Sequence, residues 1–431
     1  MTTRLWIACL ALALSDVALP ADRAQPPDWI VVSDADGLVA ALTPANAGRH
    51  VHVLRGTYVV HAPLTVPDGV ALEGEGVMLG KDLPDGFEPG TETRIVPDAL
   101  APFAGDLLTL GNAVTISGLI VQDIAGRPGN VVATTSRRPD DQISASILRC
   151  QIINPKASAA GPNGPLGRAV TVLTQNRSFG AAPPPDEGAS VSLVLTDSII
   201  QSPNGSALFA INFASRGSVT MDVTGNRVNG QFEVTAGVSR PDEVTGASVT
   251  IRSQRNAYSS PAGVGVGWTI DGGSSPPIPG FVAPGTSGDV TRFTSIGDTI
   301  EHFPTAIIAT AAKRHSLTIG PVSGNVVELQ LIDLQLSTVG PHAADLVLQA
   351  ALVDGAYAPG DDTSLRVLMA RGAGSGARQN FYANETGPAG PQQFGTGNAL
   401  TIVGSPESFS RINTNILPAP GPEFFISALD R

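Results

Sequence analysis

Residues 50–80, HVHVLRGTYVVHAPLTVPDGVALEGEGVMLG, decide how this chain folds. The stretch contains short apolar runs at 50–54, 58–60 and 70–72, which are interrupted at 56, at 67–69 and at 74 by glycine, proline and aspartate. Runs of this length with such breaks are typical of β-strands joined by tight corners. The stretch therefore predicts a succession of short strands and sharp turns.

A weak repeat continues this pattern further along the chain. Each unit has a β-branched run, a turn-forming position and a second short apolar run. The units begin at Val114, Ile143, Val191, Val219, Val249, Val290 and Val327, and their turn positions hold Gly118, Cys150, Asp197, Asn226, Asn256, Asp298 and Asp333. A constant strand frame with unequal steps predicts a solenoid with loops of different lengths, although the blades of a propeller overlap this range of periods.

The order of elements in 50–80 resembles the first coils of the pectin-lyase-like superfamily of right-handed parallel β-helix proteins. The resemblance is carried by Gly56-Thr57-Tyr58 between two strands and by the Pro67-Asp68-Gly69-Val70 corner that follows. We therefore predict an all-β fold, a right-handed single-stranded parallel β-helix with a short N-terminal capping helix and long loops. The resemblance implies that a substrate lies in a groove along the outside of one parallel sheet.

The predicted domain organisation is simple. Residues 1–24 have a positive start, an apolar run and small residues, which is the pattern of an export signal. Residues 25–431 form one β-helix domain, with the N-terminal cap at 28–49, the coils at 50–403 and a C-terminal tail or cap at 404–431. Within the cap, Ser33 or Asp34 is expected to begin a helix that runs to Leu42. Gly- and Pro-rich loops are expected at 155–168, 179–189, 259–289 and 371–398.

Composition narrows the possible partners. The chain has 431 residues, a formal net charge of −12, and only 15% charged residues, with 48 glycines and 35 prolines. A nucleic-acid-binding protein usually has a basic face or stripe, and the sequence predicts none. We expect an exported, periplasmic or extracellular protein with no transmembrane span after signal removal, whose partner is a polysaccharide or cell-surface glycan.

The resemblance implies two kinds of chemistry. Lyases of this fold use a cation, often Ca²⁺, to neutralise a uronate while a basic side chain removes a proton, and hydrolases use paired aspartates. The sequence lacks the Gly-His-Gly and Arg-Ile-Lys segments of polygalacturonases and the Trp-Ile-Asp-His segment of pectate lyases. No specific enzyme family is therefore predicted, and no cofactor beyond the Ca²⁺ that a lyase would need.

The remaining candidates are short constellations of reactive residues. Candidate catalytic residues are Asp140, Asp141, Lys313, Arg314 and His315, and candidate substrate-binding residues are Trp268 and Asp271. The aspartates and the basic triplet are expected at corners, where solvated polar residues are also common. Trp268 is interpreted either as a platform for a sugar ring or as an aromatic anchor for a long loop.

No metal site is predicted. Asp298, Glu301 and His302 are close in sequence, but an acid–histidine cluster of this kind is common by chance. His50, His52 and His61 are interpreted as surface residues beside strands.

Three functional hypotheses follow. The first is an exported enzyme acting on polysaccharide, a lyase rather than a glycoside hydrolase. The alternative is a non-catalytic surface or matrix protein that uses the β-helix as a rigid binding rod, and a polysaccharide epimerase is a weaker third hypothesis. A groove lined by clustered acids, Arg and Lys on the outer face of the longest sheet would favour an enzyme, whereas a smooth Ser/Thr/Asn face would favour the rod.

Overall fold

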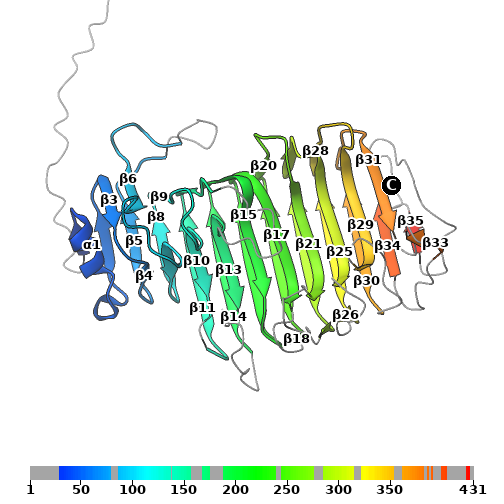
Figure 1. Cartoon of the computed structure of the whole chain (residues 1–431), viewed down its shortest axis with the longest axis horizontal. Helices are drawn as coiled ribbons and strands as arrows, with labels where there is room; N and C mark the ends of the chain where they lie inside the picture. Colours follow the sequence, from blue (N-terminus) through cyan, green and yellow to red (C-terminus); the bar gives the residue numbers. More distant parts are fainter. Residues whose placement is uncertain are drawn as a thin grey trace, which may run out of the picture.

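The computed structural model describes residues 29–78, 86–136, 138–156, 167–174, 188–238, 244–275, 285–314, 322–353, 362–382, 386–387, 390–391, 399–404 and 424–427. These residues form a parallel β-helix in which successive coils stack along one long axis (Figure 1). The predicted all-β solenoid is confirmed. The propeller alternative is wrong, because equivalent strands of successive coils pair in parallel rather than as antiparallel blades. The predicted export signal lies outside the described residues.

One face of the β-helix is a 13-stranded sheet, which we name sheet A. Each strand pairs in parallel with the equivalent strand of the next coil. Its strands, in order, are β1 (Trp29–Val32), β2 (His50–Val53), β5 (Ala71–Gly74), β8 (Val114–Ser117), β11 (Gln142–Leu148), β14 (Ser190–Thr196), β16 (Ser218–Thr224), β19 (Ser248–Gln254), β23 (Val290–Ile296), β27 (Val326–Ile332), β30 (Ser364–Ala370), β34 (Ala399–Gly404) and β35 (Phe424–Ser427). All seven repeat units read from the sequence fall on this sheet.

The rest of each coil contributes to a 17-stranded sheet B, which contains two strips. One strip consists of β3 (Gly56–Val60), β6 (Thr93–Pro97), β9 (Ile120–Gln122), β12 (Gln151–Ile153), β20 (Ala257–Ser259), β24 (Thr299–Glu301) and β28 (Gln335–Ser337). The other consists of β4 (Leu64–Val66), β7 (Leu108–Leu110), β10 (Val132–Thr135), β13 (Val170–Thr174), β21 (Val266–Ser275), β25 (Thr305–Arg314), β29 (Ala344–Val353) and β31 (Arg378–Tyr382). The long strands β15 (Ile199–Asn212) and β17 (Arg227–Val238) pair with both strips and join them.

Two small sheets complete the described strands. Strands β18 (Val244–Thr245), β22 (Thr286–Ser287) and β26 (Val322–Ser323) stack in parallel at one corner of the coils. Strands β32 (Thr386–Gly387) and β33 (Gly390–Pro391) form an antiparallel pair. The stacking of β35 on β34 places part of the predicted C-terminal segment on sheet A.

A short helix lies at the N-terminal end of the solenoid, as predicted (Figure 1). The side chain of Asp34 accepts a hydrogen bond of 2.7 Å from the backbone N–H of Gly37 and caps α1 (Ala35–Ala41). Leu38 and Ala41 are buried against the first strands, and a 3₁₀ turn, η1 (Pro44–Asn46), follows. The helix covers apolar residues of the first coil that would otherwise face water.

The core is a continuous stack of aliphatic side chains from Val32 to Ile402. In sheet A, alternate residues point inward, so that Leu72, Ile116 and Ile147 lie one above the other in successive coils. Burial of such rows is the main favourable term in folding. It is also additive along the axis, because each coil contacts mainly its neighbours.

Two loop predictions are wrong in part. Residues 259–289 contain β21, and 371–398 contain β31. In β21 the glycines that suggested a loop are required by close packing, because a Cβ on Gly272 would lie 2.3 Å from the carbonyl oxygen of Ala311 in the next coil. Glycine in a strand often marks such a close approach.

The corners after the strands of sheet A differ from the prediction in one respect. The residues in the left-handed region of backbone space there are Gly118, Arg149, Asp197, Gly225, Arg255, Gly297 and Asp333. The turn positions read from the sequence are therefore correct at 118, 197 and 333. They are one residue late at Cys150, Asn226, Asn256 and Asp298, which follow the left-handed residue.

The displaced residues form a buried hydrogen-bonded ladder. Asn226 Oδ1 accepts from the backbone N–H of Ser198 at 2.8 Å, and Asn256 Oδ1 accepts from that of Asn226 at 2.8 Å. Asp298 Oδ1 continues the series, accepting from the N–H of Asn256 at 2.7 Å. Buried backbone groups at a corner need partners, and these side chains supply them coil after coil. The cluster of Asp298, Glu301 and His302 is thus divided, since Asp298 is buried in the ladder whereas Glu301 and His302 are exposed.

Replacing Asp298 with asparagine is expected to stabilise the protein by about 1 kcal/mol near neutral pH. Burial raises the pKa of the Asp298 carboxyl in the folded state. The carboxyl therefore ionises less readily in the folded chain than in the unfolded chain, where its pKa is about 3.8, so stability is lost as the pH rises above that value. An asparagine keeps the Oδ1 acceptor and can donate to Ser295, as Asn256 donates to Ser253 at 2.9 Å.

Urea unfolding at pH about 3 and about 7 measures this effect, and the difference between variant and parent should grow with pH. Asp197→Asn is the matched control, because Asp197 occupies a corner but is exposed, and it should change little. A destabilised Asp298→Asn protein at pH 7 would mean that the ionised carboxylate is the better ladder member.

Candidate functional site

The outer surface of sheet A carries a regular array of hydroxyl groups on β11, β14, β16 and β19, which we name the hydroxyl face. It consists of Ser144, Ser146, Ser190, Ser192, Thr196, Ser218, Thr220, Thr224, Ser248 and Thr250. All of these side chains are at least partly exposed and alternate with residues that point into the core, and Val194 and Asp222 share the outer face with them. Strand alternation places such residues on one side of the sheet.

The register of the strands turns these residues into rows. Ser192 lies opposite Thr220, and Thr220 opposite Thr250, while Ser190, Ser218 and Ser248 form a neighbouring row. Strand geometry spaces the hydroxyls about 4.8 Å apart across strands and about 6.6 Å apart along them. Ser218 Oγ donates to Ser190 Oγ at 2.9 Å, so part of the array is already ordered by its own hydrogen bonds.

Charged residues on sheet A occur within the hydroxyl face and beyond it, and they pair with one another. Asp222 accepts from Arg252 at 3.3 Å. Glu328 accepts from Arg292 at 2.9 Å and from Arg366 at 3.3 Å. Asp222 and Glu328 are the acidic side chains that the strands from β8 to β30 contribute to this sheet, and both are held in these ion pairs.

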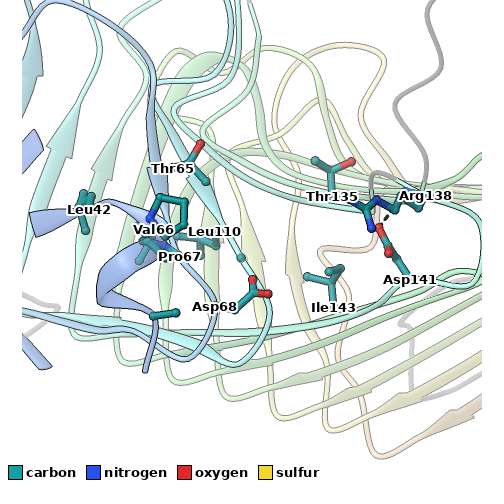
Figure 2. Close-up of a pocket in the computed structure, with 13 residues that line it drawn as sticks. Leu42, Thr65, Val66, Pro67, Asp68, Leu110, Thr135, Arg138, Asp141 and Ile143 are labelled. Atoms are coloured by element: carbon teal, nitrogen blue, oxygen red, sulfur yellow. Dashed lines mark hydrogen bonds between the residues drawn. The ribbon is translucent and has the colours of Figure 1, made fainter. Parts of the chain in front are cut away.

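A cavity of about 410 Å³ lies beside the first coils, near α1, and it includes one predicted site residue. Asp141 contributes to its wall together with Arg138, Thr135 and Asp68 (Figure 2). Leu42, Val66, Leu110 and Ile143 are among its apolar lining residues. The neighbouring Asp140 is exposed at a left-handed corner with φ of 60°.

The two carboxylates of this cavity already stabilise turns. Asp141 Oδ2 accepts from the backbone N–H of Arg138 at 2.8 Å, and Asp68 Oδ1 accepts from that of Asn112 at 2.8 Å. Aspartates commonly hold the backbone of a turn in this way. The cavity therefore combines acidic and basic groups in a recess, but both acids have a structural role as well.

The other predicted catalytic residues lie elsewhere. Lys313 and Arg314 end β25, and His315 lies outside the described residues. Strand β25 belongs to the coil of β23, four coils from β11, which is about 19 Å at the spacing of parallel strands. The structure does not bring Lys313 and Arg314 together with the Asp140–Asp141 pair.

Trp268 and Asp271 do not form a sugar platform. Trp268 is fully buried, with its ring 5.2 Å from that of Tyr258 and 4.6 Å from that of Phe293. The alternation of β21 directs Asp271 to the opposite face of the strand, where it is 6% exposed. The burial of the indole excludes the role proposed for it, since a stacking platform must be accessible.

Sequence reasoning missed two features of the outer surface. The hydroxyl rows could have been seen in the alternation of VSLVLT and VTMDVT, which places serine and threonine on one side. His50 and His52 alternate in the same way on β2, and the structure places Glu73 beside them.

The fold and this surface define a class, a parallel β-helix protein with an ordered hydroxyl-rich outer sheet. No family model matches the chain, and no curated protein matches it. Within the described residues, no helix combines the length and apolar character required to cross a membrane.

Proposed function

We propose that the protein is an exported, pectin-lyase-like parallel β-helix that binds a neutral polysaccharide along its hydroxyl face without cleaving it. The observation that carries this proposal is the regular array of serine and threonine on β11, β14, β16 and β19. A hydroxyl group both donates and accepts hydrogen bonds, as does each hydroxyl of a sugar. A flat, repeating array therefore suits a flat, repeating polymer, and a rigid sheet loses little entropy on binding.

Charge supports a neutral ligand. The chain has a formal net charge of −12, which repels a polyuronate unless a local positive strip or a cation offsets it. The arginines on sheet A do not provide such a strip, because Arg252, Arg292 and Arg366 face carboxylates of the same sheet.

The same ion pairs support a binding role over catalysis. A lyase needs a free base beside a charge-neutralising group, and a hydrolase needs two available carboxyl groups. On the strands from β8 to β30 the two acidic side chains of the outer face are already paired. The hydroxyl-rich outer surface of sheet A therefore fits a binding rod better than an enzyme.

Removal of one hydroxyl row tests the proposal. The triple variant Ser192→Ala, Thr220→Ala and Thr250→Ala should weaken retention on insoluble neutral polysaccharides at least ~10-fold, because several hydrogen bonds of about 1 kcal/mol each are lost. The matched control removes three hydroxyls from sheet B, at Thr299, Thr305 and Ser337, and should bind like the parent. Equal binding by both triple variants would contradict the proposed face.

The acidic cavity gives a second candidate function, cleavage of polysaccharide. Its specific observation is the presence of Asp68, Arg138 and Asp141 around one recess of about 410 Å³. The same polysaccharide panel, assayed with and without Ca²⁺ for reducing or unsaturated sugar ends, separates the two. If the parent forms such products and the Asp141→Asn variant does not, the protein is an enzyme and the binding proposal is wrong.

A further inference from the structure

A cluster of metal-ligating side chains lies at the N-terminal end of sheet A, away from the hydroxyl face. One ligand atom from each of His50, His52 and Glu73 lies within 4.8 Å of the other two. His50 and His52 project from the same side of β2, and Glu73 lies directly opposite His52 on β5. Four-coordinate zinc, with metal–nitrogen bonds of ~2.0–2.1 Å, places its ligand atoms ~3.3 Å apart. Small side-chain rotations would bring these atoms to that spacing.

His52 gives an independent indication that the cluster can coordinate an ion. Its Nδ1 is buried and has no hydrogen-bond partner among the described residues. Its other ring nitrogen, Nε2, lies 3.5 Å from Oε1 of Glu75. A metal-binding histidine commonly donates its second ring N–H to a carboxylate, which leaves the first nitrogen free to coordinate. Without a ligand, a buried nitrogen that has no hydrogen-bond partner destabilises the fold, because its lost hydration is not compensated.

The surroundings hold the cluster in place. The ring of Trp29 stacks on that of His50 with centroids 3.9 Å apart and an interplanar angle of 11°. Nε2 of His50 lies 2.9 Å from Oε2 of Glu73, and Oε2 of Glu75 accepts from the backbone N–H of Arg55 at 2.8 Å. The side chains are thus restricted to one side of two neighbouring strands. Restricted ligands lose less entropy when they coordinate.

We propose that His50, His52 and Glu73 bind a divalent transition metal, with Zn²⁺ as the principal candidate, and that the ion links β2 to β5. Two imidazoles and one carboxylate form a donor set typical of zinc, with a fourth position for water. Such a set discriminates against Ca²⁺, which prefers six to eight oxygen ligands. The ion would join the first coils next to the capping helix, and it would stabilise the folded state because it binds that state alone.

The test uses the full chain without a polyhistidine tag, titrated with Zn²⁺ against a chromophoric chelator. The parent should bind about one Zn²⁺ per chain. Its thermal midpoint should rise with Zn²⁺ and return when a chelator is added. Glu73→Gln and His52→Ala should each weaken binding at least ~10-fold.

His61→Ala is the matched control, because His61 pairs with Asp98 at 3.0 Å and is not a member of the cluster. It should bind Zn²⁺ like the parent. Glu73→Gln is nearly isosteric, so it keeps the test valid if a histidine variant does not fold. Absence of Zn²⁺ binding, equal affinity in Glu73→Gln and parent, or preferential binding of Ca²⁺ would each overturn the proposal.

Discussion

Replacing Asp123 with asparagine is expected to lower the free energy of unfolding by about 3–5 kcal/mol. Asp123 follows β9 and is fully buried together with two cations, Arg127 and Lys156. Arg127 donates to both carboxylate oxygens at 2.6 Å, and Nζ of Lys156 lies 2.6 Å from Oδ2. Without the carboxylate, two positive charges would remain in the interior without the counter-ion that both contact.

The other contacts of the cluster explain why it cannot simply open to solvent. Arg127 also donates to the backbone carbonyl of Asn130 at 3.1 Å and lies over the ring of Phe103 at 5.0 Å. These contacts fix the corner between two coils. A surface ion pair would contribute less than ~1 kcal/mol, because water screens it and competes for its partners.

Two variants separate charge from packing. Lys156→Met should cost much less than Asp123→Asn, because it leaves a one-to-one bidentate pair. Asp222→Asn removes an exposed partner of Arg252 and should change stability by less than ~1 kcal/mol. Urea and thermal unfolding followed by circular dichroism measure all three. An Asp123→Asn protein within 1 kcal/mol of the parent would refute the role given to the carboxylate.

The pH dependence of the same variant gives a second readout. Burial lowers the pKa of Lys156 in the folded state, whereas the unfolded value is about 10.5. A lowered pKa means that the unfolded state binds more protons, so stability rises with pH below that value. Loss of the Asp123 charge removes an interaction that opposes this shift. Asp123→Asn should therefore regain part of its lost stability, relative to the parent, as the pH is raised.

The positions of the sheet A strands were predictable because they depend on the short-range alternation of apolar and polar residues. VTIS from Val114 and VTMDVT from Val219 alternate β-branched and polar residues, and both are strands of sheet A. Composition alone was misleading at 266–275, since glycines that allow close packing of coils have the same sequence signature as glycines in a loop. The pairing register of the strands is needed to distinguish the two kinds of glycine.

The candidate sites were less predictable, because they depend on which coil stacks on which. His50 and Glu73 are 23 residues apart, and Asp123 and Lys156 belong to different coils. The lengths of the intervening loops set these separations in sequence, and short-range sequence patterns do not predict loop length. The sequence placed the candidate pair Asp140–Asp141 at a corner, and in the structure Asp141 lines a cavity. The ladder of Asn226, Asn256 and Asp298 was seen as a repeat but assigned to the wrong backbone position.

Replacing Trp268 with alanine is expected to lower the free energy of unfolding by about 3–5 kcal/mol while leaving polysaccharide binding by the folded protein unchanged. The indole is fully buried between coils and contacts the rings of Tyr258 and Phe293. Its removal would leave a large apolar cavity, which a packed stack of coils can fill only in part. Unfolding curves and retention on polysaccharide, normalised to the folded fraction, measure the two effects separately.

Trp268→Phe is the informative companion variant. The indole N–H is buried and has no hydrogen-bond partner among the described residues, so a phenyl ring loses volume but also removes an unsatisfied donor. Its cost should therefore be well below that of alanine, at about 1 kcal/mol. If Trp268→Ala instead kept its stability and lost binding, the aromatic ring would act at the surface. The stacking of coils around it, on which the assignment of the outer face depends, would then be wrong in this region.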